Sequence, residues 1–399
     1  MSDIFYLSQG KIYAFRDGRP VYFPSEAVDK YRRNIMEIYK RKEWKASGTG
    51  AMFMGMQARN IEETDIKAQV EALFLADEET LIYGASLEDS CGIYIKDPRE
   101  PNSPDRFIVR RTDTKLYYMD YQPADKLLVV SVSDGTVERH LALCHSEKGD
   151  FHMITEGEST DIMPAFSLHN PQLVYFSSAG IYFDPRRHIF HSNTFAINRL
   201  DLLSGDISEV ISDVVFDFIR PREAASGKLY CIRRPKAAKT GGAFSLLDII
   251  LMPFRLLKAI YAWLNFFSQR YTGESLTRRS GGINPAKQQQ KTDEEIFIEG
   301  NLINVGKTLK QNTQQGDKFP GIAPKTWELV RFTENGSLET VKKGVLDYTF
   351  DDRGDIVYSN GKFIIRILAD GEEEKLCPAH LATNLNFIST TAGLPIAHN

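Results

Sequence analysis

The chain has 399 residues, of which 42% are hydrophobic and 26% are charged, and its formal net charge is -4. This balance is ordinary for a soluble globular protein and gives no overall reason to expect nucleic acid as a partner. The length allows one large β domain or two to three domains of average size. The 24 Phe and 17 Tyr residues favour sheets.

The cysteines lie far apart in the sequence and lack the spacing of a metal site. They predict buried free thiols in a reducing compartment rather than disulfides or metal ligands. The first residues, MSDIFYLSQGKIYAF, lack the basic and apolar regions of a secretory signal. A cytoplasmic protein is therefore expected. The four cysteines are Cys91, Cys144, Cys231 and Cys377.

A helical excursion is predicted at residues 25–47, after three short N-terminal strands. Ser25 can cap a helix, and basic residues gather toward its end before Gly48. We expect the helix to pack on the strands that the rest of the chain predicts, with binding of a partner as the alternative. Its expected apolar face consists of Val28, Tyr31, Ile35, Ile38 and Tyr39.

A repeat of four short strands runs along most of the chain. First strands begin near residues 73, 116, 164, 215, 346 and 385, and one long interval contains a break of about 88 residues between Lys236 and Pro324. Without that break every step is about 40 to 50 residues, the period of four-stranded propeller blades. The last copy keeps only NLNFIST, so the N-terminal strands DIFYLSQ, KIYAFRDG and PVYFPS are expected to complete it.

One copy of the repeat resembles a known family. The segment DIMPAFSLHNPQLVYFSS at residues 161–178 resembles the repeat of TolB-like propellers, in which a Pro-aromatic-Ser run precedes a Pro-Asp-Gly turn and a strand. Pro164, Phe166 and Ser167 match this pattern, whereas the turn here is Leu-His-Asn-Pro. The resemblance implies a fold and no particular function, because such folds carry unrelated activities.

An insertion in the fourth copy, residues 237–323, does not follow the repeat. Residues 244–271 predict an apolar amphipathic helix that Pro253 should kink or split, and residues 278–295 predict a flexible linker. From Cys231 to Lys291 eleven Lys or Arg residues stand against two acids. An apolar helix between basic flanks is typical of an interfacial membrane anchor. Packing on the propeller and binding of a protein partner are the alternatives.

The residues expected to contact a membrane or a partner are those on the apolar face and three flanking arginines. They are Ile250, Leu251, Phe254, Leu257, Tyr261, Trp263, Leu264, Phe267, Arg233, Arg234 and Arg270. A spanning helix is not expected, because Arg255 and Lys258 would lie near its middle.

The predicted fold is an all-β, six-bladed β-propeller formed as a single domain by residues 1–399, with seven blades or two β-sandwiches as alternatives. The predicted function is a non-enzymatic binding or scaffolding propeller with a protein partner. We expect it to be cytoplasmic and attached through its amphipathic insertion to the anionic surface at the inner face of the cell membrane. No cofactor and no metal site is expected. The alternative is a hydrolase or lyase with a polar site in the central channel. The first strands of the blades are expected to line that channel, and Asp120, Asp217 and Asp347 lie within or beside three of them.

Overall fold

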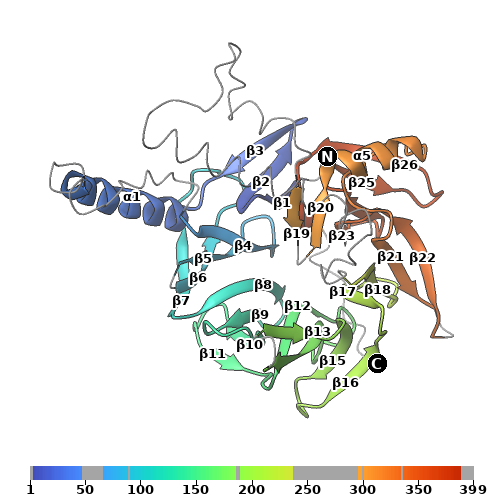
Figure 1. Cartoon of the computed structure of the whole chain (residues 1–399), viewed down its shortest axis with the longest axis horizontal. Helices are drawn as coiled ribbons and strands as arrows, with labels where there is room; N and C mark the ends of the chain where they lie inside the picture. The colour runs from blue at the N-terminus through green and yellow to red at the C-terminus, as the bar shows by residue number, and fades with distance from the viewer. Residues whose placement is uncertain are drawn as a thin grey trace, which may run out of the picture. The chain divides into compact units, whose positions relative to one another are not determined.

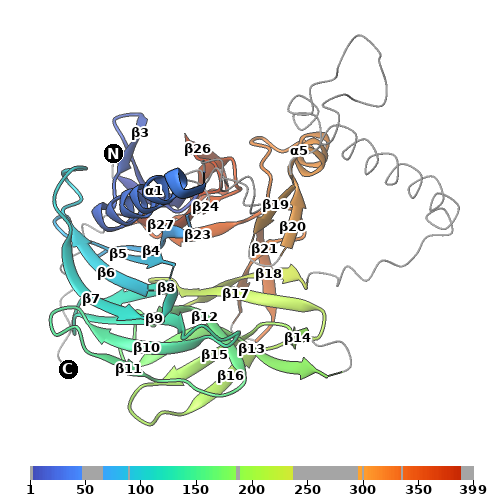
Figure 2. The same cartoon turned by 60° about the vertical axis from the view of Figure 1, so that its left-hand side comes forward.

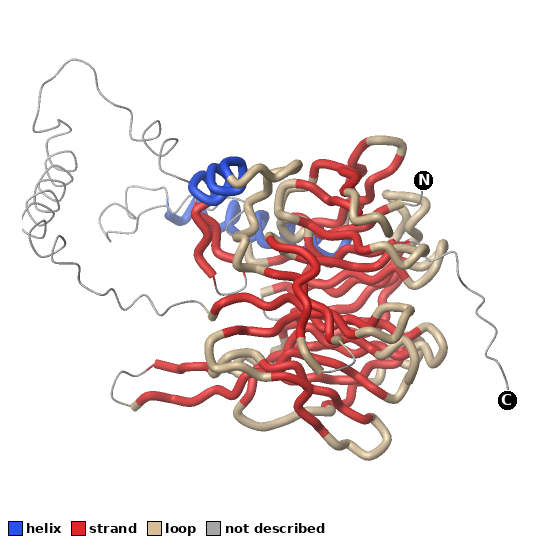
Figure 3. Tube along the Cα trace, turned by 90° about the vertical axis from the view of Figure 1, so that its right-hand side faces the viewer, coloured by secondary structure: helices blue, strands red, loops and turns tan. Residues whose placement is uncertain are grey.

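The computed structural model describes residues 3–46, 66–88, 90–185, 189–236, 295–298, 301–333 and 336–387. Strands make up most of this part of the chain (Figure 3). The chain divides into two compact units, Met1–Lys236 with Thr308–Asn399, and Ala237–Lys307. The second unit begins where the predicted insertion begins, but it ends before residue 323.

The first unit is a six-bladed β-propeller, as predicted from the repeat (Figure 1). Blades 1 to 5 follow one another along the chain, and each is antiparallel with its first strand innermost. Blade 1 contains β4 (Ala68–Leu75), β5 (Leu81–Leu87), β6 (Ser90–Lys96) and β7 (Arg106–Thr112). Blade 2 contains β8 (Lys115–Gln122), β9 (Leu127–Ser133), β10 (His140–His145) and β11 (Phe151–Met153).

The remaining consecutive blades repeat this order. Blade 3 contains β12 (Ser159–Phe166), β13 (Leu173–Asp184), β15 (Ala196–Asp201) and β16 (Ile207–Ile211). Blade 4 contains β17 (Phe216–Glu223), β18 (Leu229–Pro235), β21 (Glu328–Phe332) and β22 (Leu338–Lys343). Blade 5 contains β23 (Asp347–Phe350), β24 (Ile356–Ser359), β25 (Phe363–Ile367) and β26 (Glu373–Pro378).

The closing blade joins the two ends of the chain. Its innermost strand is β27 (Thr383–Phe387), followed by β1 (Ile4–Ser8), β2 (Lys11–Arg16) and β3 (Arg19–Phe23). β27 and β1 are antiparallel, with Ile4 opposite Phe387. The predicted closure by one C-terminal and three N-terminal strands is therefore confirmed. The pairing removes the open sheet edges that an unclosed ring would expose.

The two faces of a blade strand contact two different neighbours, which explains why the strands are apolar without strict alternation. In β1, Phe5 and Leu7 pack with residues of blade 1, whereas Ile4 and Tyr6 pack with residues of blade 5. All four side chains are buried. A strand buried on both faces becomes a continuous apolar run.

Truncation of Phe5 tests the closing blade. Phe5 is fully buried and meets Phe23 edge to face at 5.3 Å between ring centroids. We expect Phe5→Ala to lower the free energy of unfolding by about 3–5 kcal/mol, because a large cavity would remain. Denaturant titration measures the loss, with Leu203→Ala, at an 80% exposed position, as control. A loss below about 1 kcal/mol for Phe5→Ala would contradict the closure.

Helix α1 (Glu26–Ala46) lies between β3 and β4 (Figure 2). The Ser25 hydroxyl accepts a hydrogen bond from the amide of Val28 at 3.3 Å, which is the expected cap. Val28 is buried, and Tyr31 and Ile35 pack against the core that blade 1 shares with the closing blade. Ile38 and Tyr39 are exposed, contrary to expectation, because the helix extends beyond the sheets it packs on (Figure 1).

Three local elements were not expected from the sequence. β13 spans 12 residues and continues into a hairpin with β14 (Ile189–Ser192). The second unit contains the antiparallel pair β19 (Glu295–Ile298) and β20 (Asn301–Asn304), and helix α5 (Val305–Gln314) follows. The predicted helix at residues 244–271 and all but the last residue of the predicted linker at residues 278–295 lie outside the described residues.

All four cysteines are free and buried, as predicted. Burial raises the pKa of Cys91 to about 11 and the pKa values of Cys144 and Cys377 to about 12. These thiols are therefore protonated at neutral pH, and buried, protonated thiols react slowly.

Candidate functional site

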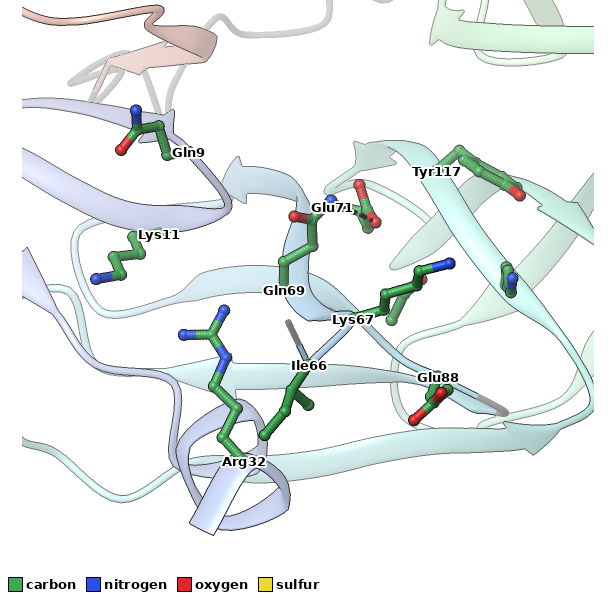
Figure 4. A pocket seen from close by; sticks show the side chains of 11 residues that line it. Gln9, Lys11, Arg32, Ile66, Lys67, Gln69, Glu71, Glu88 and Tyr117 are labelled. Carbon is green, nitrogen blue, oxygen red and sulfur yellow. Dashed lines mark hydrogen bonds between the residues drawn. The ribbon is translucent and has the colours of Figure 1, made fainter. Parts of the chain in front are cut away.

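A cavity of about 630 Å³ opens at the end of the propeller where the inner strands begin, which we call the starting end. Because the blades are antiparallel, the turns between second and third strands lie at this same end. The closing blade, α1, blade 1 and blade 2 all contribute to its lining (Figure 4). The lining residues are Gln9, Lys11, Arg32, Ile66, Lys67, Gln69, Glu71, Ser86, Glu88, Lys115 and Tyr117.

Strand alternation places polar side chains at this cavity. Lys67, Gln69 and Glu71 occupy alternate positions at the start of β4, whereas Ala68 and Val70 between them are buried. Successive side chains of a strand point to opposite faces, so these three share one side. In β8 the same pattern puts Lys115 and Tyr117 at the cavity and Leu116 in the core.

Four cations line the cavity, and their side chains come from four separate parts of the chain. Within the described residues none of Lys11, Arg32, Lys67 and Lys115 forms an ion pair. Arg32 is held in place because its Nε and Nη2 donate to the carbonyl of Ala68 at 3.1 and 2.6 Å. Figure 4 shows Lys11, Arg32 and Lys67 on different elements around the cavity.

A fifth cation and two carboxylates complete the electrostatics. The guanidinium of Arg139 lies 3.8 Å from the ring centroid of Tyr117, a cation–π distance. Glu71 accepts a hydrogen bond from Gln69 at 3.0 Å, and Glu88 accepts one from the Tyr31 hydroxyl at 3.4 Å.

Burial raises the pKa of Glu71. The hydrogen bond from Gln69 and the charges of Arg139 and Lys115 act in the opposite direction but do not cancel the effect of burial. At a pH near its pKa, the Glu71 carboxyl is therefore less ionised than an exposed glutamate would be. It then offsets less of the surrounding positive charge.

The variant Glu71→Gln tests this burial. A carboxyl whose folded-state pKa is raised destabilises the fold above that pKa, and the cost vanishes below the unfolded-state pKa. We expect the variant to be more stable than the parent at neutral pH, with a difference that shrinks as the pH falls toward about 4. Urea titrations over this pH range, with Glu156→Gln at an exposed position between β11 and β12 as matched control, measure the effect. A stability difference that grows on acidification would contradict it.

Two of the arginines expected at the membrane flank are engaged inside blade 4. Arg234 is buried, lies 3.6 Å from the carboxylate of Asp217 and stacks at 5.1 Å on the ring of Trp327. Arg233 forms an ion pair with Glu328 on the neighbouring strand. Their charges are compensated within the sheet, so we leave both out of the proposed membrane surface.

The other residues expected at that surface lie outside the described residues. They are Ile250, Leu251, Phe254, Leu257, Tyr261, Trp263, Leu264, Phe267 and Arg270.

The three acids expected beside the channel each contact an arginine or a backbone amide of the protein. Asp347 lies 3.3 Å from Arg220 of the preceding blade, and both side chains are buried. Asp217 faces Arg234, as described above, and accepts from the amide of Phe195 at 3.0 Å. Asp120 accepts from the amide of Phe166 at 2.7 Å, and burial raises its pKa. These carboxylates join adjacent strands and blades.

Two further features hold for the described residues. Among them, no group of three or more His, Cys, Asp or Glu side chains has an arrangement that could hold a metal ion. The helices described here include none with the length and apolar character needed to cross a membrane.

The sequence did not predict the cavity, because its lining comes from segments that are distant along the chain. One local signal was available: a lysine precedes or opens the inner strand of two successive blades, Lys67 before β4 and Lys115 in β8. Comparing equivalent positions of the repeat would have brought these two lysines together.

No family model and no curated protein matches the sequence. In structure the chain is similar to TolB from Acinetobacter baumannii, with 10% identity and a TM-score of 0.49 over 97% of this chain and 66% of that one. It is also similar to a putative TolB from Agrobacterium tumefaciens, with 12% identity and a TM-score of 0.40 over 80% of this chain and 85% of that one.

An oligogalacturonate lyase in complex with manganese is similar over 77% of this chain and 64% of its own, at 11% identity and a TM-score of 0.37. The chain thus spans just under two thirds of the length of the Acinetobacter protein. At these identities the similarities concern the fold alone. The six-bladed propeller expected from the repeat is confirmed by the strand order itself, and the blades define the class.

Proposed function

We propose that this chain is a non-enzymatic binding propeller that holds a protein partner in the starting-end cavity. The observation that carries the proposal is the cavity itself, which is about 630 Å³ in volume and lined by polar side chains from three blades and a helix. Its volume lies within the range of about 300–1,000 Å³ found for ligand sites. Sites on a rigid sheet scaffold, reached from its turns, are common places for binding.

The ion pairs of Asp217 and Asp347 favour binding over the hydrolase or lyase alternative. A general acid or base needs access to its substrate and a pKa suited to proton transfer. Asp217 and Asp347 instead lie against buried arginines, so both carboxylates are held by the fold rather than open to a substrate. The cavity, in contrast, offers many hydrogen-bonding groups without a nucleophile beside a base in the described lining.

A selection experiment tests the binding function. Peptides are first selected from a random displayed library for binding to the purified parent protein. Their affinity for a variant with an obstructed cavity should be at least about tenfold lower than their affinity for the parent. Gln69→Trp provides the obstruction without a change of charge, because Gln69 is an exposed lining residue. Thermal unfolding checks that the variant is folded. If the selected peptides bind parent and variant equally, this cavity is not the binding site.

Attachment to an anionic membrane surface through residues 244–271 is the second part of the proposal. It is supported by the sequence, which combines an apolar stretch with Arg270, Arg278, Arg279 and Lys287 on its C-terminal side. Such a combination gives acyl-chain burial together with attraction to anionic headgroups. The protein would then be cytoplasmic and peripheral at the inner face of the cell membrane.

Sedimentation with lipid vesicles tests this attachment. The parent should bind vesicles that contain anionic lipid and dissociate in part at high salt, because salt screens the basic residues. Replacement of Ile250, Phe254, Leu257 and Phe267 by Ser should abolish binding and leave the unfolding temperature unchanged. If the parent does not bind and the variant melts much lower, the segment packs within the protein.

A further inference from the structure

The cavity concentrates positive charge in a chain that is negative overall. Its lining carries four cations and two carboxylates, whereas the whole chain has a formal net charge of -4. As shown above, none of the four cations has an ion-pair partner among the described residues. Several lysines elsewhere in the propeller are paired, including Lys96 with Asp105 and Lys343 with Glu328.

Unpaired cations in one concave site repel one another, and an incoming anion relieves that repulsion. A concave surface with walls of low dielectric also strengthens the field at its centre. Arg32 is already oriented, since two of its five guanidinium N–H donors are bound to the carbonyl of Ala68. Lys67 and Lys115 are exposed and able to adjust their ammonium groups to a ligand.

The other lining groups suit a peptide better than a small anion. Gln9 and Gln69 carry amides that both donate and accept, and Glu88 can accept from backbone N–H groups. A small inorganic anion would fill little of a cavity of about 630 Å³. A short peptide segment with acidic side chains offers carboxylates to the cations and amides to the remaining polar groups.

We propose that the starting-end cavity binds an acidic segment of a protein partner, with carboxylates placed among Arg32, Lys67 and Lys115. This inference rests on the binding function proposed above and specifies the chemistry of the ligand. Lys11, on the closing blade, extends the positive side of the site to a third blade. Recognition of acidic motifs by clustered cations is an established mode of peptide binding.

Fluorescence anisotropy with labelled hexaglutamate, hexaglutamine and hexalysine tests the proposal. Hexaglutamate should bind the parent at least about tenfold more tightly than hexaglutamine, and its affinity should fall between about 50 and about 300 mM salt. Hexalysine should not bind at the cavity. Equal affinity for hexaglutamate and hexaglutamine would overturn the proposal.

A pair of double variants separates the cavity from the overall charge of the protein. Lys67→Glu with Lys115→Glu should weaken hexaglutamate binding by about tenfold or more. Lys148→Glu with Lys228→Glu changes the net charge equally at exposed turns of the opposite end and should leave binding within about twofold. Similar losses in the two variants would mean that binding is non-specific, and would refute the site.

Two further outcomes show whether the binding function or the acidic ligand class is wrong. If hexaglutamate does not bind but library-selected peptides lose affinity on Gln69→Trp, the cavity binds peptides and the acidic ligand class is wrong. If inorganic phosphate displaces bound hexaglutamate at a lower concentration than unlabelled hexaglutamate does, the site prefers a small anion and the segment is wrong. Displacement only by unlabelled hexaglutamate supports the proposal.

Discussion

Closure of the ring is the constraint on which the rest of this propeller depends. Each blade buries both of its faces against neighbours, so a blade without a neighbour would expose a large apolar surface. The pairing of β1 with β27 supplies the last neighbour from opposite ends of the sequence. The side chain of Asn386 then donates to the carbonyl of Leu73, which links the closing blade to the inner strand of blade 1.

Similar hydrogen bonds join successive blades and hold their inner strands in place relative to one another. Ser86 in blade 1 donates to the carbonyl of Leu116 in blade 2, and Ser131 in blade 2 donates to the carbonyl of Asp161 in blade 3. Both serines are buried in second strands, where a small side chain allows the next inner strand to approach. Tyr348 and Arg220 make a comparable connection between blades 5 and 4. These contacts hold the inner strands, and hence Lys67 and Lys115, in fixed register.

The fold was predictable because its signals are local and repeated. Short apolar strands, turns at regular spacing and an incomplete last copy gave the blade number and the closure. The candidate site was not predictable, because Lys11, Arg32, Lys67 and Lys115 meet only after the ring has closed. Arg234 shows why a residue can be wrongly assigned to a surface. A basic residue beside an apolar segment has the same sequence pattern whether it contacts lipid or a buried carboxylate such as that of Asp217.

The position of the cavity has a consequence for how the closed ring is maintained. Gln9 lies in the β1–β2 turn and Lys11 opens β2, and both belong to the blade that only non-covalent contacts complete. A ligand that fills the cavity would contact the closing blade together with blades 1 and 2. By mass action, occupancy would stabilise the closed ring relative to the opened ring. Ligand concentration and the stability of the native state would then be coupled through the pairing of β1 with β27.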